Sequence, residues 1–333
     1  MTRRGRLALS LAIVMSGACA REDARPVIGL ITKTESNPFF VSMKDGAERA
    51  ATADGFRLLT AGGKSDGDNA SQVTALENMV AAGAKTIMIT VNDSKAIVPA
   101  IAKARAQGVM VIALDSPADP IEATDGLFAT DNYLAGELIG QYARASLGTR
   151  APRIATIDLL PGHPVGAQRH NGFLQGFGLV TNPRTSNELA QPPEVVCMVD
   201  SYGDRAKGQT GMENCLQKNP EINVVYTINE PSAAGAYNAL EKAGKASGVV
   251  IVSVDGGCDG IKAIQAGHLG ATAQQYPSTM AELGVRAARA FASTHVKASG
   301  YTDTGVRLIT ARPLAGLPSL SADSALAVCW GAR

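Results

Sequence analysis

Runs of consecutive apolar residues alternate along the chain with segments in which apolar residues recur every three or four positions. In the first half, the runs at 27–31, 56–60, 86–90 and 109–115 predict strands, and the segments 71–82 and 95–107 predict helices. Strands that are apolar at every position are buried on both faces. The pattern therefore predicts a parallel sheet covered by helices on both sides.

The first strand leads into a helix through a polar loop. Asn37 followed by Pro38 is a helix start, because the Asn side chain can accept from a free backbone N–H and proline lacks a donor that the first turn does not need. Ligands of open α/β sheets bind beyond the carboxyl ends of the strands. Asn37, Phe39 and Phe40 are thus candidate ligand contacts, and the alternative is that Asn37 is only an N-cap and both rings are only core.

The same alternation begins again near residue 154. It predicts strands at 154–160, 195–198, 224–228, 249–254 and 271–273, with helices at 167–177, 206–218, 232–243 and 261–266. The fold class is therefore α/β, with two doubly wound parallel-sheet lobes that meet around residues 129–132. Periodicity alone does not assign the helix at 280–293 or the strand at 306–310 to either lobe.

The first twenty residues have a different pattern. Three arginines precede an apolar run at 7–15, and small residues follow at 16–20, as in a secretory signal peptide. Cleavage after Ala20 would release a soluble protein, whereas an imperfect lipobox ending at Cys19 would give a lipid-anchored one. Either reading predicts export out of the cytoplasm.

Composition restricts the function and the compartment. With 333 residues and a formal charge of +1, the chain has no basic excess for nucleic acid. Of its 5 cysteines, four lie beyond the signal, an even set that suits an oxidising compartment. Three pairings are possible. We expect Cys197–Cys215 and Cys258–Cys329, with four buried thiols as the alternative; the sparse histidines and the missing C-x-x-C argue against zinc.

The chain carries none of the common catalytic motifs. Gly62-Gly-Lys-Ser65 resembles the end of a phosphate loop, but Leu58 stands where the first glycine is required. Polar residues do recur at predicted strand ends and on one helix: Thr90, Asp115, Thr130, Arg169, Asn229, Asp255 and Gln275. Carboxylates, amides and a guanidinium beside phenyl rings suit an uncharged polyol, whose hydroxyls donate and accept while a ring covers its C–H patch. No acid and base are gathered for proton transfer, so we do not expect an enzyme.

An ordered series of short motifs resembles the periplasmic ribose/galactose-type sugar-binding proteins of ABC importers over nearly the whole mature chain. The motifs are Asn37-Pro-Phe-Phe40, Ile112-Ala-Leu-Asp115, Ala129-Thr-Asp-Asn132, Gln168-Arg-His-Asn-Gly-Phe173, Asp204-Arg-Ala-Lys-Gly208, Asn229-Glu230, Val254-Asp-Gly256 and Gln274-Gln-Tyr-Pro277. Longer stretches, including the ending Cys329-Trp330-Gly331, resemble the fructose-binding branch of that family.

The resemblance implies a sugar site. It implies contacts from Asn37, Phe39, Phe40, Thr90, Asp115, Thr130, Arg169, Asn229, Asp255 and Gln275. Gly203 and Val254 stand where relatives carry aromatic residues, which predicts a wider pocket and a bulkier or differently puckered sugar than ribose, with Tyr202 as a compensating ring. Fructose is the expected ligand, mannose and ribose are next, and inositol or galactose is the alternative.

The resemblance also implies the domain plan and the partners. It assigns residues 26–130 with 276–308 to an N-terminal lobe and 131–275 with 309–333 to a C-terminal lobe, hinged at three crossovers. The partners would be a monosaccharide and the membrane permease and ATPase of an importer, with no cofactor, no metal and no nucleic acid, and the protein would be a monomer. A sugar-acting enzyme and a ligand sensor of the same fold are the remaining alternatives.

Overall fold

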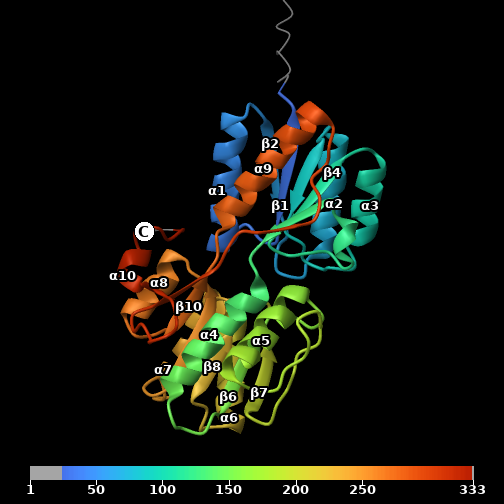
Figure 1. The fold of residues 1–333 in the computed structure, drawn as a ribbon. Helices are drawn as coiled ribbons and strands as arrows, with labels where there is room; N and C mark the ends of the chain where they lie inside the picture. Colours follow the sequence, from blue (N-terminus) through green and yellow to red (C-terminus); the bar gives the residue numbers. More distant parts are fainter. Residues whose placement is uncertain (1–24, 332–333) are drawn as a thin grey trace, which may run out of the picture.

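The computed structural model describes residues 25–331 of the chain. The predicted signal peptide and Cys19 lie outside the described residues. Two lobes follow one another along the long axis of the molecule, each a sheet flanked by helices (Figure 1). No helix among residues 25–331 is long and apolar enough to cross a membrane.

The first lobe is built on a six-stranded parallel sheet. Its strand order is β11-β5-β4-β3-β1-β2. The strands are β1 (Val27–Thr32), β2 (Arg57–Gly62), β3 (Thr86–Ile89), β4 (Met110–Leu114), β5 (Gly126–Ala129) and β11 (Tyr301–Asp303). Its helices are α1 (Pro38–Ala53), α2 (Asn69–Ala81), α3 (Val98–Ala106), the short η1 (Ile121–Ala123) and α9 (Pro277–Thr294). Helices α1 and α9 share one apolar cluster with β1 and β4, and α2 and α3 cover the opposite face.

The second lobe has a seven-stranded sheet of order β13-β12-β10-β9-β8-β6-β7, in which β12 runs antiparallel to β10. The strands are β6 (Ile154–Asp158), β7 (Val195–Asp200), β8 (Val224–Thr227), β9 (Val250–Asp255), β10 (Ala271–Gln274), β12 (Arg307–Thr310) and β13 (Leu320–Ser321). The helices are α4 (Asn132–Leu147), α5 (Pro164–Phe177), α6 (Arg205–Lys218), α7 (Glu230–Lys242), α8 (Cys258–Gln265) and α10 (Ala322–Ala325).

The α/β prediction and the two parallel-sheet lobes are confirmed, and two elements near the seam are new. Strand β5 and helix α4 fall in a stretch for which the sequence pattern predicts no element. β5 is only four residues long and begins with glycine, and α4 contains Gly136 and Gly140, which lower helix propensity. Tertiary packing accounts for the helix.

Helices α4 and α5 approach to backbone contact. A Cβ added at Gly136 would overlap the carbonyl oxygen of Arg169, and one at Gly172 would overlap the carbonyl oxygen of Tyr133. Only glycine therefore fits at the crossing, which explains why this helix is rich in a poor helix former. The contact makes the two helices one rigid support for Arg169.

The chain passes between the lobes at three places: 130–131, 275–276 and 304–306. The predicted boundary after residue 308 is wrong by two residues. Arg307 and Leu308 already pair with Gln274 and Ala273 of the second sheet, because β12 adds to the exposed edge of β10. The tail that follows joins the second lobe.

Two disulfides lie in the second lobe, and both expected pairings are confirmed. Cys197 of β7 is joined to Cys215 of α6, with Cα atoms 5.6 Å apart. Cys258 at the start of α8 is joined to Cys329 of the C-terminal tail, with Cα atoms 5.0 Å apart. The second bridge fixes the tail to the lobe.

Candidate functional site

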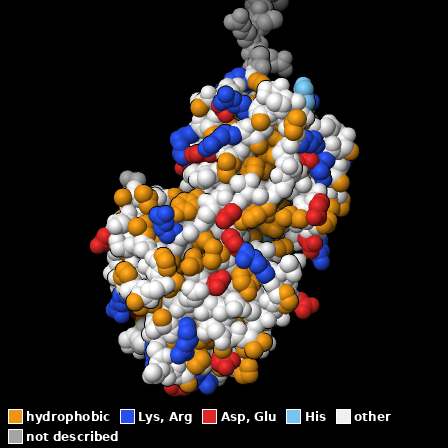
Figure 2. Space-filling view, in the orientation of Figure 1, with side chains coloured by type: hydrophobic (Ala, Val, Ile, Leu, Met, Phe, Trp, Pro, Cys, Tyr) orange, Lys and Arg blue, Asp and Glu red, His pale blue; other side chains and the backbone are white. Residues whose placement is uncertain are grey.

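The facing surfaces of the two lobes enclose a polar cleft where the strands of both sheets end. On the face drawn in Figure 2, acidic and basic side chains lie next to one another where the lobes meet. The cleft is lined by Lys33, Asn37, Phe39, Phe40, Asp66, Asp115, Leu159, Val165, Arg169, Ile228, Asn229, Asp255 and Gln275. Its volume is about 40 Å³, far below the ~300–1,000 Å³ of typical small-molecule pockets. A sugar can therefore enter only when the lobes separate.

Eight of the ten residues predicted for the site line this cleft. They are Asn37, Phe39, Phe40, Asp115, Arg169, Asn229, Asp255 and Gln275. They come from both lobes and from the crossover at 275–276. Strand ends, the helix start at Asn37 and one helix residue supplied these candidates, and the family resemblance joined them into one predicted site.

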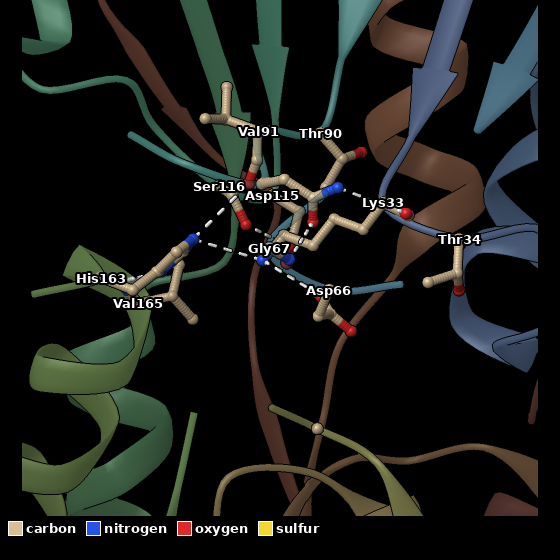
Figure 3. A network of polar contacts seen from close by, with 12 residues as sticks. Lys33, Thr34, Asp66, Gly67, Thr90, Val91, Asp115, Ser116, His163 and Val165 are labelled. Atoms are coloured by element: carbon tan, nitrogen blue, oxygen red, sulfur yellow. Dashed lines mark hydrogen bonds and ion pairs between the residues drawn. The ribbon is translucent and has the colours of Figure 1, made fainter. Parts of the chain in front are cut away.

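Thr90 and Thr130 do not line the cleft, which corrects both predictions. Thr90 is fully buried, and its Oγ1 donates to Met43 Sδ at 3.4 Å beneath the cleft (Figure 3). Thr130 is buried beside the first crossover, and its Oγ1 has no hydrogen-bond partner among the described residues. Both residues follow a strand, but alternation along the strand directs their side chains elsewhere.

Each lobe contributes one aspartate whose backbone has a positive φ. Asp115 follows β4 with φ 62°, and Asp255 ends β9 with φ 145°. Non-glycine residues adopt this region rarely and at a cost of about 1–3 kcal/mol, and such residues concentrate at functional sites. Asp115 and Asp255 thus combine a strained backbone with a carboxyl group at the cleft, and they lie at strand ends on its opposite walls.

Arg169 is fixed by hydrogen bonds on one side and faces Asp115 on the other. Its Nε donates to Asn132 Oδ1 at 2.7 Å, and its Nη1 donates to the carbonyl oxygen of Ile228 at 2.9 Å. Its Nη2 lies 4.0 Å from Asp115 Oδ1 of the other lobe. Ser116 Oγ donates to the second oxygen of Asp115 at 2.9 Å. The guanidinium therefore reaches the cleft in one orientation.

Gln275 and Asp255 form a polar pair at the crossover. Gln275 Nε2 donates to Asp255 Oδ1 at 3.0 Å. Gln275 Oε1 is buried without a hydrogen-bond partner among the described residues, so it is an acceptor ready for a hydroxyl. Burial raises the pKa of Asp255 to about 7; Arg169 opposes that rise and Asp115 adds to it.

The two asparagines of the cleft cap helices. Asn37 Oδ1 accepts from the backbone N–H of Phe39 at 3.0 Å and thereby begins α1. Asn229 Oδ1 accepts from the N–H of Ser232, and its Nδ2 donates to the carbonyl oxygen of Gly203 at 3.0 Å. The N-cap reading is therefore right for both, and it coexists with their position on the cleft. Of these two asparagines, Asn229 donates a hydrogen bond from its Nδ2, whereas the Nδ2 of Asn37 donates none to the residues that the structure describes.

The apolar surfaces of the two walls differ. Phe39 and Phe40 of the first lobe pack edge to face with ring centroids 5.3 Å apart. The second lobe offers the aliphatic Leu159, Val165 and Ile228 in place of rings. Aromatic rings on only one wall of the cleft are expected, because Gly203 stands where relatives carry an aromatic residue.

Two other details of the pocket prediction are wrong. Val254 is completely buried in the core of the second lobe, so its size does not set the width of the cleft. Tyr202 does not line the cleft; its ring instead carries the ammonium of Lys207 at 3.9 Å from the centroid. None of the described residues of the second lobe adds an aromatic ring to the lining of the cleft.

Lys33, Asp66 and His163 form a polar network that the sequence analysis missed (Figure 3). Lys33 Nζ lies 3.3 Å from His163 Nε2 of the second lobe and 3.8 Å from Asp66 Oδ1. Burial lowers the pKa of Lys33, although the carboxylates of Asp66 and Asp115 oppose this, and burial raises the pKa of Asp66. Burial, with Lys33 nearby, lowers the pKa of His163 well below its usual value.

A sequence signal existed for only part of this network. Lys33 directly follows β1, so the rule that selected the other strand-end residues also applies to it. Asp66 lies in an irregular loop, and the apolar Leu159, Val165 and Ile228 cannot be told from core residues by periodicity. These four residues could be found only from the structure.

The charges of the cleft nearly balance. Two basic side chains, Lys33 and Arg169, face three carboxyl groups, and burial favours the neutral forms of Lys33, Asp66 and Asp255, which leaves Arg169 opposite Asp115. Such a site offers no excess charge to an ionic ligand and many donors and acceptors to a neutral one. Residues 25–331 hold no group of three His, Cys, Asp or Glu side chains that could bind a metal ion.

Comparison with known proteins places this architecture. The model of the periplasmic binding protein domain matches residues 28–294. The ribose import binding protein of Escherichia coli (strain K12) is 33% identical over 269 residues, covering 81% of this chain and 86% of that protein. Its counterpart in Bacillus subtilis (strain 168) is 31% identical over 292 residues, with coverages of 84% and 90%.

Solved structures agree. A solute-binding protein from Actinobacillus succinogenes 130z with bound D-allose superposes with a TM-score of 0.75 at 25% identity, covering 86% of this chain and 98% of that one. The periplasmic component of a sugar transport system from Hahella chejuensis gives a TM-score of 0.76 at 28% identity, with coverages of 85% and 99%. These relatives bind and deliver solutes and are not enzymes. The chain therefore belongs to the periplasmic binding protein family, among the sugar-binding proteins of ABC importers.

Proposed function

We propose that this protein captures one neutral monosaccharide in the cleft and delivers it to the permease and ATPase of its importer. Fructose is the first candidate, and mannose and ribose follow. The observation that carries the proposal is the set of hydrogen-bonding groups that face one another across the lobes with little net charge. Asp115, Arg169, Asp255 and the unpartnered Gln275 Oε1 each match a hydroxyl that can donate or accept.

The difference between the two walls supports a ketose. Phe39 and Phe40 can cover one apolar face of a sugar ring, while the wall with Leu159, Val165 and Ile228 is aliphatic. The anomeric carbon of fructose carries both a hydroxyl and a hydroxymethyl group and no hydrogen, so fructose offers fewer ring C–H groups to a second aromatic ring than an aldose does. A site with aromatic rings on a single face suits such a sugar.

Binding is coupled to closure of the lobes. Polar contacts already join the lobes: they include Lys33 to His163 and Arg169 to Asp115 at the cleft, and Asn187 Nδ2 to Asp119 Oδ2 at 3.4 Å outside it. A ligand that touches both walls adds contacts that exist only in the closed form and shifts the equilibrium towards it. A micromolar sugar would supply about −8 kcal/mol for capture and closure together. The closed form is then the one that the permease recognises.

Thermal shift followed by calorimetry tests the ligand. Purified protein is mixed with fructose, mannose, ribose, allose, galactose and myo-inositol. A sugar at 1,000 times its Kd adds about 4 kcal/mol to the free energy of unfolding, so the ligand stands out. Fructose is expected to give the largest shift, and stabilisation by galactose or inositol alone would show that the choice of sugar is wrong.

We also propose that the protein is exported by residues 1–20 and acts as a monomer in the periplasm. The mass of the mature protein distinguishes cleavage after Ala20 from acylation of Cys19. Light scattering with and without sugar reports the oligomeric state. A dimer that forms only with sugar would contradict the monomer.

A further inference from the structure

The C-terminal tail returns to the cleft after it has left the second sheet. Cys329, which follows α10 in the sequence, forms a disulfide with Cys258. The backbone N–H of Cys258 donates to the carbonyl oxygen of Trp330 at 2.9 Å. Trp330 also pairs with Gly257 as an isolated parallel bridge. The backbone of Trp330 is thus fixed to the second lobe, immediately beside Asp255.

The side chain of Trp330 reaches the other lobe. Its ring lies 5.5 Å from that of Phe39, at 80° and therefore edge to face. The ring packs against the apolar cluster of the first lobe that contains Phe39, Phe40 and Met43. Its Nε1–H donates to the carbonyl oxygen of Gln275 at 2.9 Å. One side chain therefore contacts a cleft ring of one lobe and the backbone of the crossover.

A larger hollow lies on the outer side of Trp330. It has a volume of about 500 Å³, runs between α7 and α8, and includes Trp330 in its wall. Asn37 and Asp255 line both this hollow and the cleft. Apart from Asn37 and Pro38, the hollow is lined by the second lobe alone, whereas both lobes line the cleft, so we regard the cleft as the sugar site. Truncation of the indole would expose the outer edge of Phe39 to this open space.

We propose that Trp330 is a positioning residue of the sugar site, which supports Phe39 and separates the cleft from the hollow, and that the Cys258–Cys329 disulfide holds it there. This inference rests on the proposed sugar binding. Since the two rings belong to different lobes, their contact also favours the closed form. The affinity for sugar then depends on a tail residue that does not line the cleft, and it falls when that disulfide is absent.

The first experiment measures Kd by calorimetry for the sugar that stabilises the wild type most. Trp330→Ala is expected to weaken binding about tenfold, because it removes the ring contact with Phe39 and leaves Phe39 without support on that side. Trp330→Phe keeps a ring against Phe39 and is expected to stay within about threefold of the wild type. A Kd for Trp330→Ala within twofold of the wild type would overturn the proposal.

The second experiment uses the two disulfides as a matched pair. Replacing Cys258 and Cys329 by serine frees the tail, whereas replacing Cys197 and Cys215 removes a bridge from the far end of the same lobe. The first double variant is expected to lose about tenfold in affinity and the second to lose less than about twofold, each measured at a temperature where the unliganded variant is folded. Equal losses would assign the effect to general stability and overturn the proposal.

Intrinsic fluorescence gives an independent readout, because the chain contains 1 tryptophan. Sugar should change the emission of Trp330 in the wild type but not in the variant without Cys258 and Cys329. An unchanged wild-type emission under saturating sugar would contradict a role at the lobe boundary. If no sugar binds the wild type at all, the proposed function fails before this inference is tested.

Discussion

The two lobes carry similar sheets but recognise a ligand in different ways. The first lobe presents the ring faces of Phe39 and Phe40, and the second presents the guanidinium of Arg169 and the edges of amide and carboxyl groups. Both place a strained aspartate at a strand end, Asp115 on one side and Asp255 on the other. The comparison indicates that the first lobe alone offers aromatic rings to the apolar face of a sugar, while polar groups of both lobes can bind its hydroxyls.

The largest effect is expected at the wall of the second lobe, which offers polar groups but no aromatic ring to the sugar. Asp255→Ala should weaken sugar binding at least about 100-fold, since it removes hydrogen bonds to the sugar and leaves their buried partners unpaired, at a cost of about 1–3 kcal/mol for each such group. Calorimetry measures the loss. The carboxyl contacts only Gln275 and the backbone of Glu230 by hydrogen bonds within residues 25–331, so the melting temperature without sugar should change far less than the affinity.

Asp259→Ala is the matched control for this variant, because Asp259 is an exposed carboxylate of the neighbouring helix α8. Its affinity should equal that of the wild type. Retained affinity in Asp255→Ala would mean that Asp255 does not contact the sugar, and the proposed difference between the two walls would then be wrong.

A smaller effect is expected at the wall of ring faces. Phe39→Leu keeps most of the buried volume but removes the aromatic face, so affinity should fall about tenfold. Phe177→Leu makes the same change in the core of the second lobe, away from the cleft, and should leave the Kd unchanged. Similar losses in both variants would mean that core packing, and not stacking, explains the effect.

The buried carboxyl groups of the second lobe should also make the free energy of unfolding depend on pH. Burial raises the pKa of Asp255 to about 7 and that of Glu230 to about 8, against the hydrogen bonds that Glu230 accepts from Gly256, Gly257 and Thr272. The folded state thus holds protons that the unfolded chain releases near pH 4, so stability from these groups is lost as the pH rises from about 4 to 7 or 8.

Denaturant unfolding of the unliganded protein between pH 5 and 7 measures this loss. Asp255→Asn removes one titrating group, and its advantage over the wild type should grow by up to about 1.4 kcal/mol per pH unit. Asp259→Asn provides the control, with a constant difference expected. An advantage that shrinks as the pH rises would show that the pKa of Asp255 is not raised.

The smallest effect is expected at Thr90, which the sequence pattern placed in the site and the structure does not. Thr90→Val replaces the hydroxyl that contacts Met43 by a methyl group of similar size. The Kd should stay within about twofold of the wild type in the same titration. A tenfold loss would restore Thr90 to the first-lobe wall.

Much of the fold and most of the candidate site follow from the sequence, for a common physical reason. Strands buried on both faces give unbroken apolar runs, and the residue after such a run must be polar where the strand reaches the cleft. Asp115 and Asp255 satisfy this rule. Thr90 and Thr130 satisfy it too, but their side chains point away, because the rule locates a backbone position and not a direction.

The residues that were missed depend on tertiary packing. Asp66 lies in a loop without periodicity, and Trp330 reaches Phe39 only because a disulfide returns the tail to the lobe boundary. Helix α4 was missed because its glycines oppose helix formation locally and are selected by its contact with α5. In each case the deciding contact joins residues far apart in the sequence.

The close crossing of α4 and α5 has a consequence for altering the protein into a sensor for another sugar. Any side chain larger than hydrogen at Gly136 would displace the backbone that carries Arg169. The arginine is therefore a poor starting point for library design, whereas Lys33 and Asp66 lie in loops outside the helix crossing. New preferences should be sought in the first lobe, with the helix pair left as a fixed platform.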